Sequence, residues 1–258
     1  MAVTTEQVKD LREKTGISVM QCKRALEEAG GDMEKAVAIL KKTSADIAEK
    51  KAGREAKDGA VAIKEEGGKA VLVTLHCETD FVAKNADFLS LLEKLSSFAL
   101  KEGVEKMKAE AKDMIDLIIQ KTGEKIELGE CKEAKNGTLG SYVHTNGKIG
   151  VIVSLKGGTP ELARDVAMHA AAMKPEYVTE AEVDESAQNT MREIFEKEIA
   201  EINKPEEIKK KMLEGKMSSY FKEKTLVSQA FIKDPELTVG ALLEKNGAEI
   251  LEMARSAI

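Results

Sequence analysis

Tryptophan is absent from this chain of 258 residues, and aromatic residues make up only 3% of it. Each phenylalanine is therefore a candidate either for the core or for an anchor on a partner surface. The three cysteines, Cys22, Cys77 and Cys131, are widely spaced, and they form neither a disulfide framework nor a Cys-x-x-Cys pair. No stretch approaches the ~20 apolar residues of a membrane span, and no apolar signal core opens the chain. We therefore expect a cytoplasmic protein with no membrane contact.

Charge and composition further limit the class of protein that this chain can belong to. The net charge of −6 argues against a general nucleic-acid binder, although residues 1–57 carry a slight excess of cations. Charged residues make up 33% of the chain, with abundant alanine, glutamate and lysine, which favours helix. A chain of this length with 42% hydrophobic residues can bury a sufficient core without a metal or a disulfide.

Catalytic motifs are also lacking. The sequence has no Gly-x-x-x-x-Gly-Lys-Ser/Thr phosphate loop and no Gly-x-Gly-x-x-Gly fingerprint. Its three histidines are scattered and have no zinc-ligand spacing. Glu78 and Asp80 form the one carboxylate pair that acid–base chemistry could use, but a solvated or capping role is the favoured interpretation. We expect a protein that is not an enzyme and that needs no cofactor or metal.

The pattern of apolar residues predicts an α+β fold. Residues 1–41 read as three short helices, with Thr4, Ser18 and Asp32 as N-caps, followed by a charged, helix-prone linker over 42–57. The second helix has a core stripe at helical spacing, and Met20 lies almost opposite that stripe. An exposed methionine beside cations suits a partner surface, although a lone exposed apolar residue is also common.

Two hairpin-and-helix units follow. The first has strands over 59–75 around a Gly-rich turn and a helix over 87–101; the second has strands over 138–155 around Asn146-Gly147 and a helix over 160–173. We read these as two related α/β subdomains. Residues 182–222 predict an antiparallel helical hairpin, interpreted as a coiled coil, and a further helix is expected from Thr238 to Lys245.

The segment 76–85, His-Cys-Glu-Thr-Asp-Phe-Val-Ala-Lys-Asn, is the most informative part of the chain. It joins an apolar strand to a helix, and such connections commonly present binding groups. In one interpretation, Phe81 packs under the helix start as a staple while Asp80 or Asn85 caps the helix. In the other, Phe81 is a partner anchor next to the carboxylate of Asp80.

Residues 11–26 and 78–85 resemble the signatures of bacterial elongation factor Ts, and shorter matches occur at 139–144, 167–175 and 238–243. That family is the guanine-nucleotide exchange factor for the translational GTPase elongation factor Tu. The resemblance implies four parts: an N-terminal three-helix module similar to ubiquitin-associated (UBA) domains, two α/β core subdomains, and a helical hairpin inserted in the second. They would span 1–54, 55–137, 138–180 with 225–258, and 181–224.

The resemblance also implies the contact residues. Thr79, Asp80, Phe81 and Val82 would approach the Mg²⁺ site of the GTPase, where the ring of Phe81 wedges between elements and Asp80 disturbs the surroundings of the metal. The phosphate loop of the GTPase would then release GDP. The other expected contacts are Arg12, Met20 and Lys23, on a helix of the GTP-binding domain, together with Thr122, Gly123 and His144.

One departure from the family pattern lies in residues 246–258, where the usual Arg-Phe-x-Val-Gly-Glu-Gly-type strand is not recognisable. From this we expect a core strand and one GTPase contact to be missing. The alternative function is a non-catalytic scaffold that binds proteins through the three-helix module and forms a homodimer through 182–222.

Overall fold

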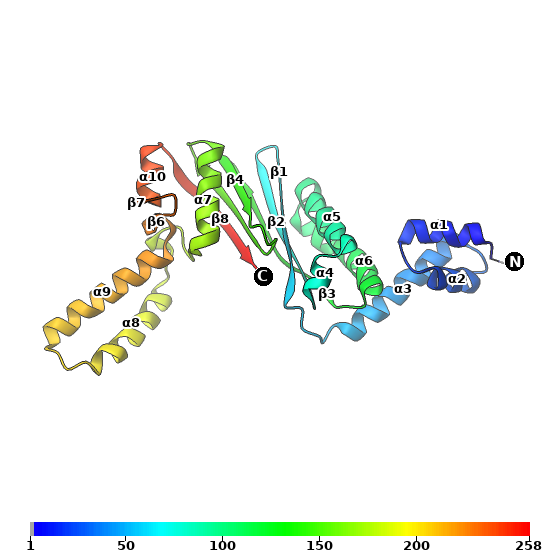
Figure 1. Cartoon of the computed structure of the whole chain (residues 1–258), viewed down its shortest axis with the longest axis horizontal. Helices are drawn as coiled ribbons and strands as arrows, with labels where there is room; N and C mark the ends of the chain where they lie inside the picture. Colours follow the sequence, from blue (N-terminus) through cyan, green and yellow to red (C-terminus); the bar gives the residue numbers. More distant parts are fainter. Residues whose placement is uncertain (1–2) are drawn as a thin grey trace. The chain divides into compact units, whose positions relative to one another are not determined.

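The computed structural model describes residues 3–258 and shows a mixture of helices and strands, as an α+β fold requires (Figure 1). The chain divides into two compact units. The first comprises residues 1–133, 143–150 and 256–258, and the second comprises 134–142 and 151–255. The domain bounds expected from the resemblance stay predictions, and each unit is described below by itself.

The first unit begins with three helices: α1 (Thr5–Thr15), α2 (Val19–Glu28) and α3 (Met33–Lys51). Thr4, Ser18 and Asp32 cap them, as predicted, by accepting hydrogen bonds from backbone N–H groups of the first turn. Their small core includes Leu11, Ile17, Cys22, Leu26 and Leu40. The predicted linker at 42–57 is wrong in part, because α3 continues unbroken to Lys51 and buries Ser44.

A three-stranded sheet follows, in the order β1-β2-β3: β1 (Asp58–Glu66), β2 (Lys69–Cys77) and β3 (Ile126–Lys135). Strands β1 and β2 pair antiparallel from Asp58↔Cys77 to Glu66↔Lys69. The turn between them uses Gly67 and Gly68, whose φ angles of 61° and 74° are the left-handed values that glycine tolerates. The first predicted hairpin is therefore confirmed.

Helices α4 (Asp80–Ala83), α5 (Ala86–Glu102) and α6 (Val104–Thr122) complete this unit. Phe88, Leu92 and Leu95 on α5 pack with residues of β2 and α6 in one buried cluster. The sequence analysis assigned no element to 104–137, where α6 and β3 lie. The helical spacing of Met107, Ala111, Ile115 and Ile118 was the signal that it missed.

The second sheet has the order β4-β5-β8: β4 (Thr138–Val143), β5 (Ile149–Lys156) and β8 (Glu249–Ala257). Helix α7 (Pro160–Met173) and the predicted helix near the C-terminus, α10 (Val239–Lys245), are present. Two short strands, β6 (Ala230–Phe231) and β7 (Asp234–Thr238), precede α10. The expectation of a missing core strand is wrong, because residues 249–257 form β8 despite their unusual sequence.

The predicted helical hairpin consists of α8 (Glu185–Ala200) and α9 (Glu206–Lys224). Phe195 of α8 meets Tyr220 of α9 edge to face, with ring centroids 6.0 Å apart. Pro205 stands one position before α9 as its N-cap. The coiled-coil and UBA interpretations stay predictions. Within residues 3–258, no helix is both long enough and apolar enough to cross a membrane.

A buried histidine in the second unit forms hydrogen bonds with residues far away in the sequence. His169 on α7 is completely buried, and its Nε2 lies 2.9 Å from Oε1 of Gln229. The backbone N–H of Ile232 donates to Nδ1 of the ring over 3.2 Å. Because Nδ1 accepts a hydrogen bond, Nε2 carries the proton of the neutral ring. Burial lowers the pKa of His169, and the bond to Gln229 opposes this shift only in part.

We expect this histidine to make stability pH-dependent. Below its ordinary pKa of 6.5 the unfolded chain binds a proton that the folded chain does not. The free energy of unfolding should therefore fall as the pH drops below this value, with a slope of up to about 1.4 kcal/mol per pH unit. Urea denaturation between about pH 5 and about pH 7.5 measures the slope. His169→Gln should lose this component, and an unchanged slope would contradict the assignment.

Candidate functional site

Helix α4 presents the aromatic side chain of the 76–85 segment. Strand β2 ends at Cys77, and the side chain of Thr79 caps α4 by accepting from the N–H of Val82. Val82 and Ala83 face the core, whereas Phe81 is 82% exposed. The staple interpretation of Phe81 is therefore wrong. A large aromatic ring is held in water on a one-turn helix whose opposite face is buried.

Glu124, in the α6–β3 connection, accepts two hydrogen bonds from Thr79. We call this pair of hydrogen bonds the Glu124 bridge. Oε2 of Glu124 accepts from the backbone N–H of Thr79 over 3.1 Å, and its Oε1 accepts from the Thr79 hydroxyl over 2.7 Å. The N–H of Glu124 donates in turn to Oγ1 of Thr122 over 3.3 Å. Gly123, between them, has a φ of 74° and ends α6. The structure thus brings the predicted contacts at 79–82 and 122–123 together.

The two carboxylates of the segment have separate cationic partners. Asp80 accepts from Nζ of Lys84 over 2.8 Å, and this bond raises the pKa of the lysine. Glu78 accepts from the backbone N–H of Lys125 over 2.6 Å, which lowers its pKa, and it also pairs with Arg54. This geometry does not favour a pair that shares one proton. Asp80 is not a helix cap, but Asn85 caps α5 as predicted.

The turn that carries His144 is bonded to β1. Lys148 pairs with Asp58 over 3.0 Å, and the N–H of Val61 donates to the carbonyl of Gly147 over 2.8 Å. Burial disfavours the charge of Asp58, but Lys148 and the N–H of Gly59 outweigh it and lower the pKa of this carboxyl. Asp58 lies opposite Cys77 in the β1–β2 ladder. Cys77 in turn is two residues before Thr79 in the chain. His144 itself is exposed.

Burial raises the pKa of the Cys77 thiol to about 12. The thiol donates to the carbonyl of Thr79 over 3.2 Å, so it supports the start of α4. A thiol with so high a pKa is almost entirely protonated at neutral pH and is a poor nucleophile. Cys77 is therefore part of the scaffold of the segment.

The N-terminal helices supply the remaining predicted contacts. Arg12, Met20 and Lys23 are exposed; Met20 is 60% exposed, which confirms its position away from the core stripe. Arg12 lines a polar cleft of about 290 Å³ whose other wall includes Asp87 and Lys121. These two residues pair over 3.1 Å at the start of α5 and the end of α6.

One residue that supports the segment was missed by the sequence analysis. Glu124 was missed because its role depends on a contact with Thr79, 45 positions away in the chain. Within residues 3–258, no group of three or more His, Cys, Asp or Glu side chains is placed to hold a metal ion.

The fold and the segment together define an α+β protein that presents an exposed aromatic side chain on a short helix anchored in the core. The sequence model of the family described as Elongation factor TS matches residues 78–258. The chain is 42% identical to elongation factor Ts of Teredinibacter turnerae, covering 99% of this chain and 90% of that protein. It is 41% identical to that of Pseudomonas fluorescens (99% and 90%) and 39% identical to that of Hahella chejuensis (98% and 91%). The chain belongs to the elongation factor Ts family of translation elongation factors.

Proposed function

We propose that this protein is a guanine-nucleotide exchange factor that binds elongation factor Tu in its GDP-bound form and promotes release of GDP. The observation that carries this proposal is the 82% exposure of Phe81 beside Asp80 on a helix fixed to the core. Exposing a large aromatic ring to water is unfavourable, so its position on the folded surface is best explained by a partner that covers it.

Phe81 and Asp80 have different roles in the proposed mechanism. The ring of Phe81 inserts between elements of the GTPase close to its bound Mg²⁺. Asp80, which pairs with the exposed side chain of Lys84, brings a carboxylate that disturbs the surroundings of the metal. Loss of the metal contacts loosens the phosphate loop, and GDP dissociates.

The energetics follow from linkage. The factor must bind the nucleotide-free form of the GTPase better than the GDP-bound form, and GDP must weaken factor binding by the same ratio. A 10⁴-fold weakening of GDP binding requires roughly 5.5 kcal/mol of differential binding. A buried aromatic anchor contributes about 2–4 kcal/mol, so Phe81 cannot account for the whole effect.

The rest of the differential binding comes from further contacts on the first unit. Arg12, Met20 and Lys23 of the N-terminal helices dock on a helix of the GTP-binding domain. The second group is Thr122 and Gly123, which the Glu124 bridge holds next to Thr79. His144 adds a contact from the turn bonded to β1.

Release of a fluorescent GDP analogue from purified elongation factor Tu tests the proposal. A catalytic amount of this protein, with excess unlabelled GDP, should accelerate the release. No acceleration from a folded sample would reject the proposal and leave the scaffold alternative, in which removal of residues 1–41 abolishes protein binding while Phe81→Ala has no effect.

The Glu124 bridge gives a prediction for the residue that positions α4. Thr79→Val keeps the shape of the side chain but removes the hydroxyl that donates to Glu124 and accepts from Val82. Loss of an N-cap costs about 0.5–2 kcal/mol of stability, and we expect the GDP release rate to fall about five- to twentyfold as α4 loosens. Thermal unfolding and the release assay measure the two effects.

Thr238→Val is the matched control, because Thr238 caps α10 by accepting from the N–H of Ala241 over 3.1 Å. This variant should lose a similar amount of stability and keep its exchange rate. Equal exchange rates in the two variants would show that the Glu124 bridge has no part in exchange.

A further inference from the structure

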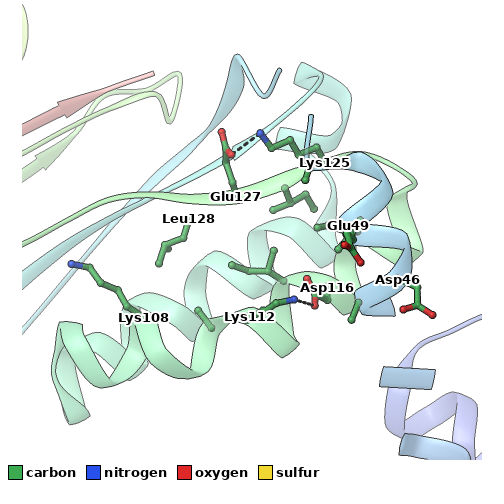
Figure 2. Close-up of a pocket in the computed structure, with 15 residues that line it drawn as sticks. Asp46, Glu49, Lys108, Lys112, Asp116, Lys125, Glu127 and Leu128 are labelled. Carbon is green, nitrogen blue, oxygen red and sulfur yellow. Dashed lines mark hydrogen bonds and ion pairs between the residues drawn. The ribbon is translucent and has the colours of Figure 1, made fainter. Parts of the chain in front are cut away.

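A groove in the first unit is separate from the residues used in the proposed exchange function. It has a volume of about 610 Å³ and lies between α3, α6 and the beginning of β3 (Figure 2). On the α3 side, Ala45 and Ala48, with Ala52 just after the helix, have small side chains that leave the space open, and Asp46 and Glu49 lie between them in the sequence. The floor is apolar and consists of Ala111, Ile115 and Ile119 of α6 with Ile126 and Leu128 of β3, of which all but Leu128 are largely buried. The remaining lining residues are charged.

The walls of the groove are held in place by contacts between α3 and α6. Lys41 pairs with Asp113 over 2.9 Å near one end of the crossing. Ser44 bonds the side chain of Gln120, and Lys51 donates to the carbonyl of Gly123 at the other end. The groove is therefore a feature of two helices bonded to each other along their crossing.

Charged residues of both signs line the groove, and they differ in whether they have a partner. Lys125 pairs with Glu127 over 2.7 Å, and Lys108 pairs with Glu105 over 2.9 Å, so these cations are compensated. The side chains of Asp46 and Glu49 on α3 form no ion pair or hydrogen bond with any residue in 3–258. Figure 2 shows both on α3, at the end of the groove opposite Lys108.

Asp116 adds a third carboxylate to this end. Its side chain is only 9% exposed, and its ion-pair partner is Lys112, over 2.6 Å, whose side chain is 72% exposed. Glu49 also acts on Lys112 electrostatically. Lys112 thus pairs with Asp116 and attracts Glu49, while the side chain of Asp46 forms no ion pair with any residue in 3–258. Against this one lysine, the three carboxylates leave an excess of negative charge beside the apolar floor of the groove.

We propose that this groove binds a basic amphipathic helix of a partner protein. Apolar side chains of such a helix would cover the isoleucines of the floor, and its lysines or arginines would reach Asp46, Glu49 and Asp116. The stretch of α6 from Lys108 to Ile119 is about 17 Å long, which matches about three turns of a bound helix. An acidic segment would meet repulsion at the α3 end, and a second copy of this chain carries a net charge of −6.

The probe is a fluorescein-labelled peptide of about 14 residues, with leucines at i, i+3, i+4 and i+7 and lysines elsewhere, binding the full-length protein in fluorescence anisotropy. Two comparison peptides have the lysines replaced by glutamates or the same residues in scrambled order. We expect the basic amphipathic peptide to bind at least about tenfold more tightly than either. Equal binding of the scrambled peptide, or no binding of the probe, would overturn the proposal.

Variants locate the binding to the groove. Ala48→Trp fills the space, and Asp46→Asn with Glu49→Gln removes two of the three carboxylates; each should weaken probe binding about tenfold. The matched control is Glu65→Gln with Glu66→Gln, the same change in charge at the exposed end of β1, and it should change the affinity less than about twofold. Circular dichroism checks the fold. If the control weakens binding as much as the groove variants, the attraction is to the overall charge and the groove is not the site.

Discussion

Replacing Phe81 by alanine should reduce the acceleration of GDP release by about 30- to 1,000-fold, the equivalent of the 2–4 kcal/mol that a buried aromatic anchor contributes. The free energy of unfolding should remain within about 0.5 kcal/mol of the wild-type value, because the ring is exposed and contributes little to the core. The fluorescent release assay measures the first effect and urea denaturation the second.

Leu89→Ala is the control for this experiment. Leu89 is also an exposed apolar residue near the start of a helix in the same unit, but it lies outside α4. Its truncation should change the release rate less than about threefold. If Phe81→Ala retained the wild-type rate, the wedge mechanism would be rejected even if the protein proved to be an exchange factor through its other contacts.

Truncation of Phe88, seven residues further on, should have the opposite pair of effects. This ring is completely buried against residues of β2 and α6, so Phe88→Ala leaves a cavity in the core of the first unit. Such substitutions cost about 3–5 kcal/mol of stability. We expect a large loss in urea denaturation, and an exchange rate per folded molecule that stays close to normal.

The conservative variant Phe88→Leu tests whether the loss of stability in Phe88→Ala comes from the lost side-chain volume. It fills most of the cavity and should recover more than half of the lost stability, about 2 kcal/mol or more. Should Phe88→Ala leave the protein stable but inactive, the division of the two phenylalanines into a core residue and a surface anchor would be wrong.

Local sequence patterns were sufficient for the parts of the fold that depend on neighbouring residues. The caps at Thr4, Ser18 and Asp32, the glycine turn at 67–68 and the exposed Met20 could be predicted because each depends on spacing within a few positions. The helix over 33–51 was predicted too short, since its second half is charged and is stabilised by packing on α6.

Contacts between distant residues explain what was missed. Strand β8 has the exposed residues Glu249, Leu251 and Glu252, and its assignment depends on pairing in the second sheet, which its own sequence does not reveal. The Glu124 bridge joins positions 79 and 124 in the same way. Even the choice between the two interpretations of Phe81 required the structure, because the staple and the anchor have the same sequence pattern.

The two hydrogen bonds between Glu124 and Thr79 lower the entropy that is lost when the segment associates with another molecule. A side chain on a free loop loses conformational freedom when it binds, and that loss weakens every complex it forms. Because α4 is already held by two hydrogen bonds and by the burial of Val82 and Ala83, Phe81 meets its partner with little left to order. Under the proposed function, this small remaining cost is the same whether the GTPase holds GDP or is empty. Discrimination between those two forms must then arise from changes within the GTPase.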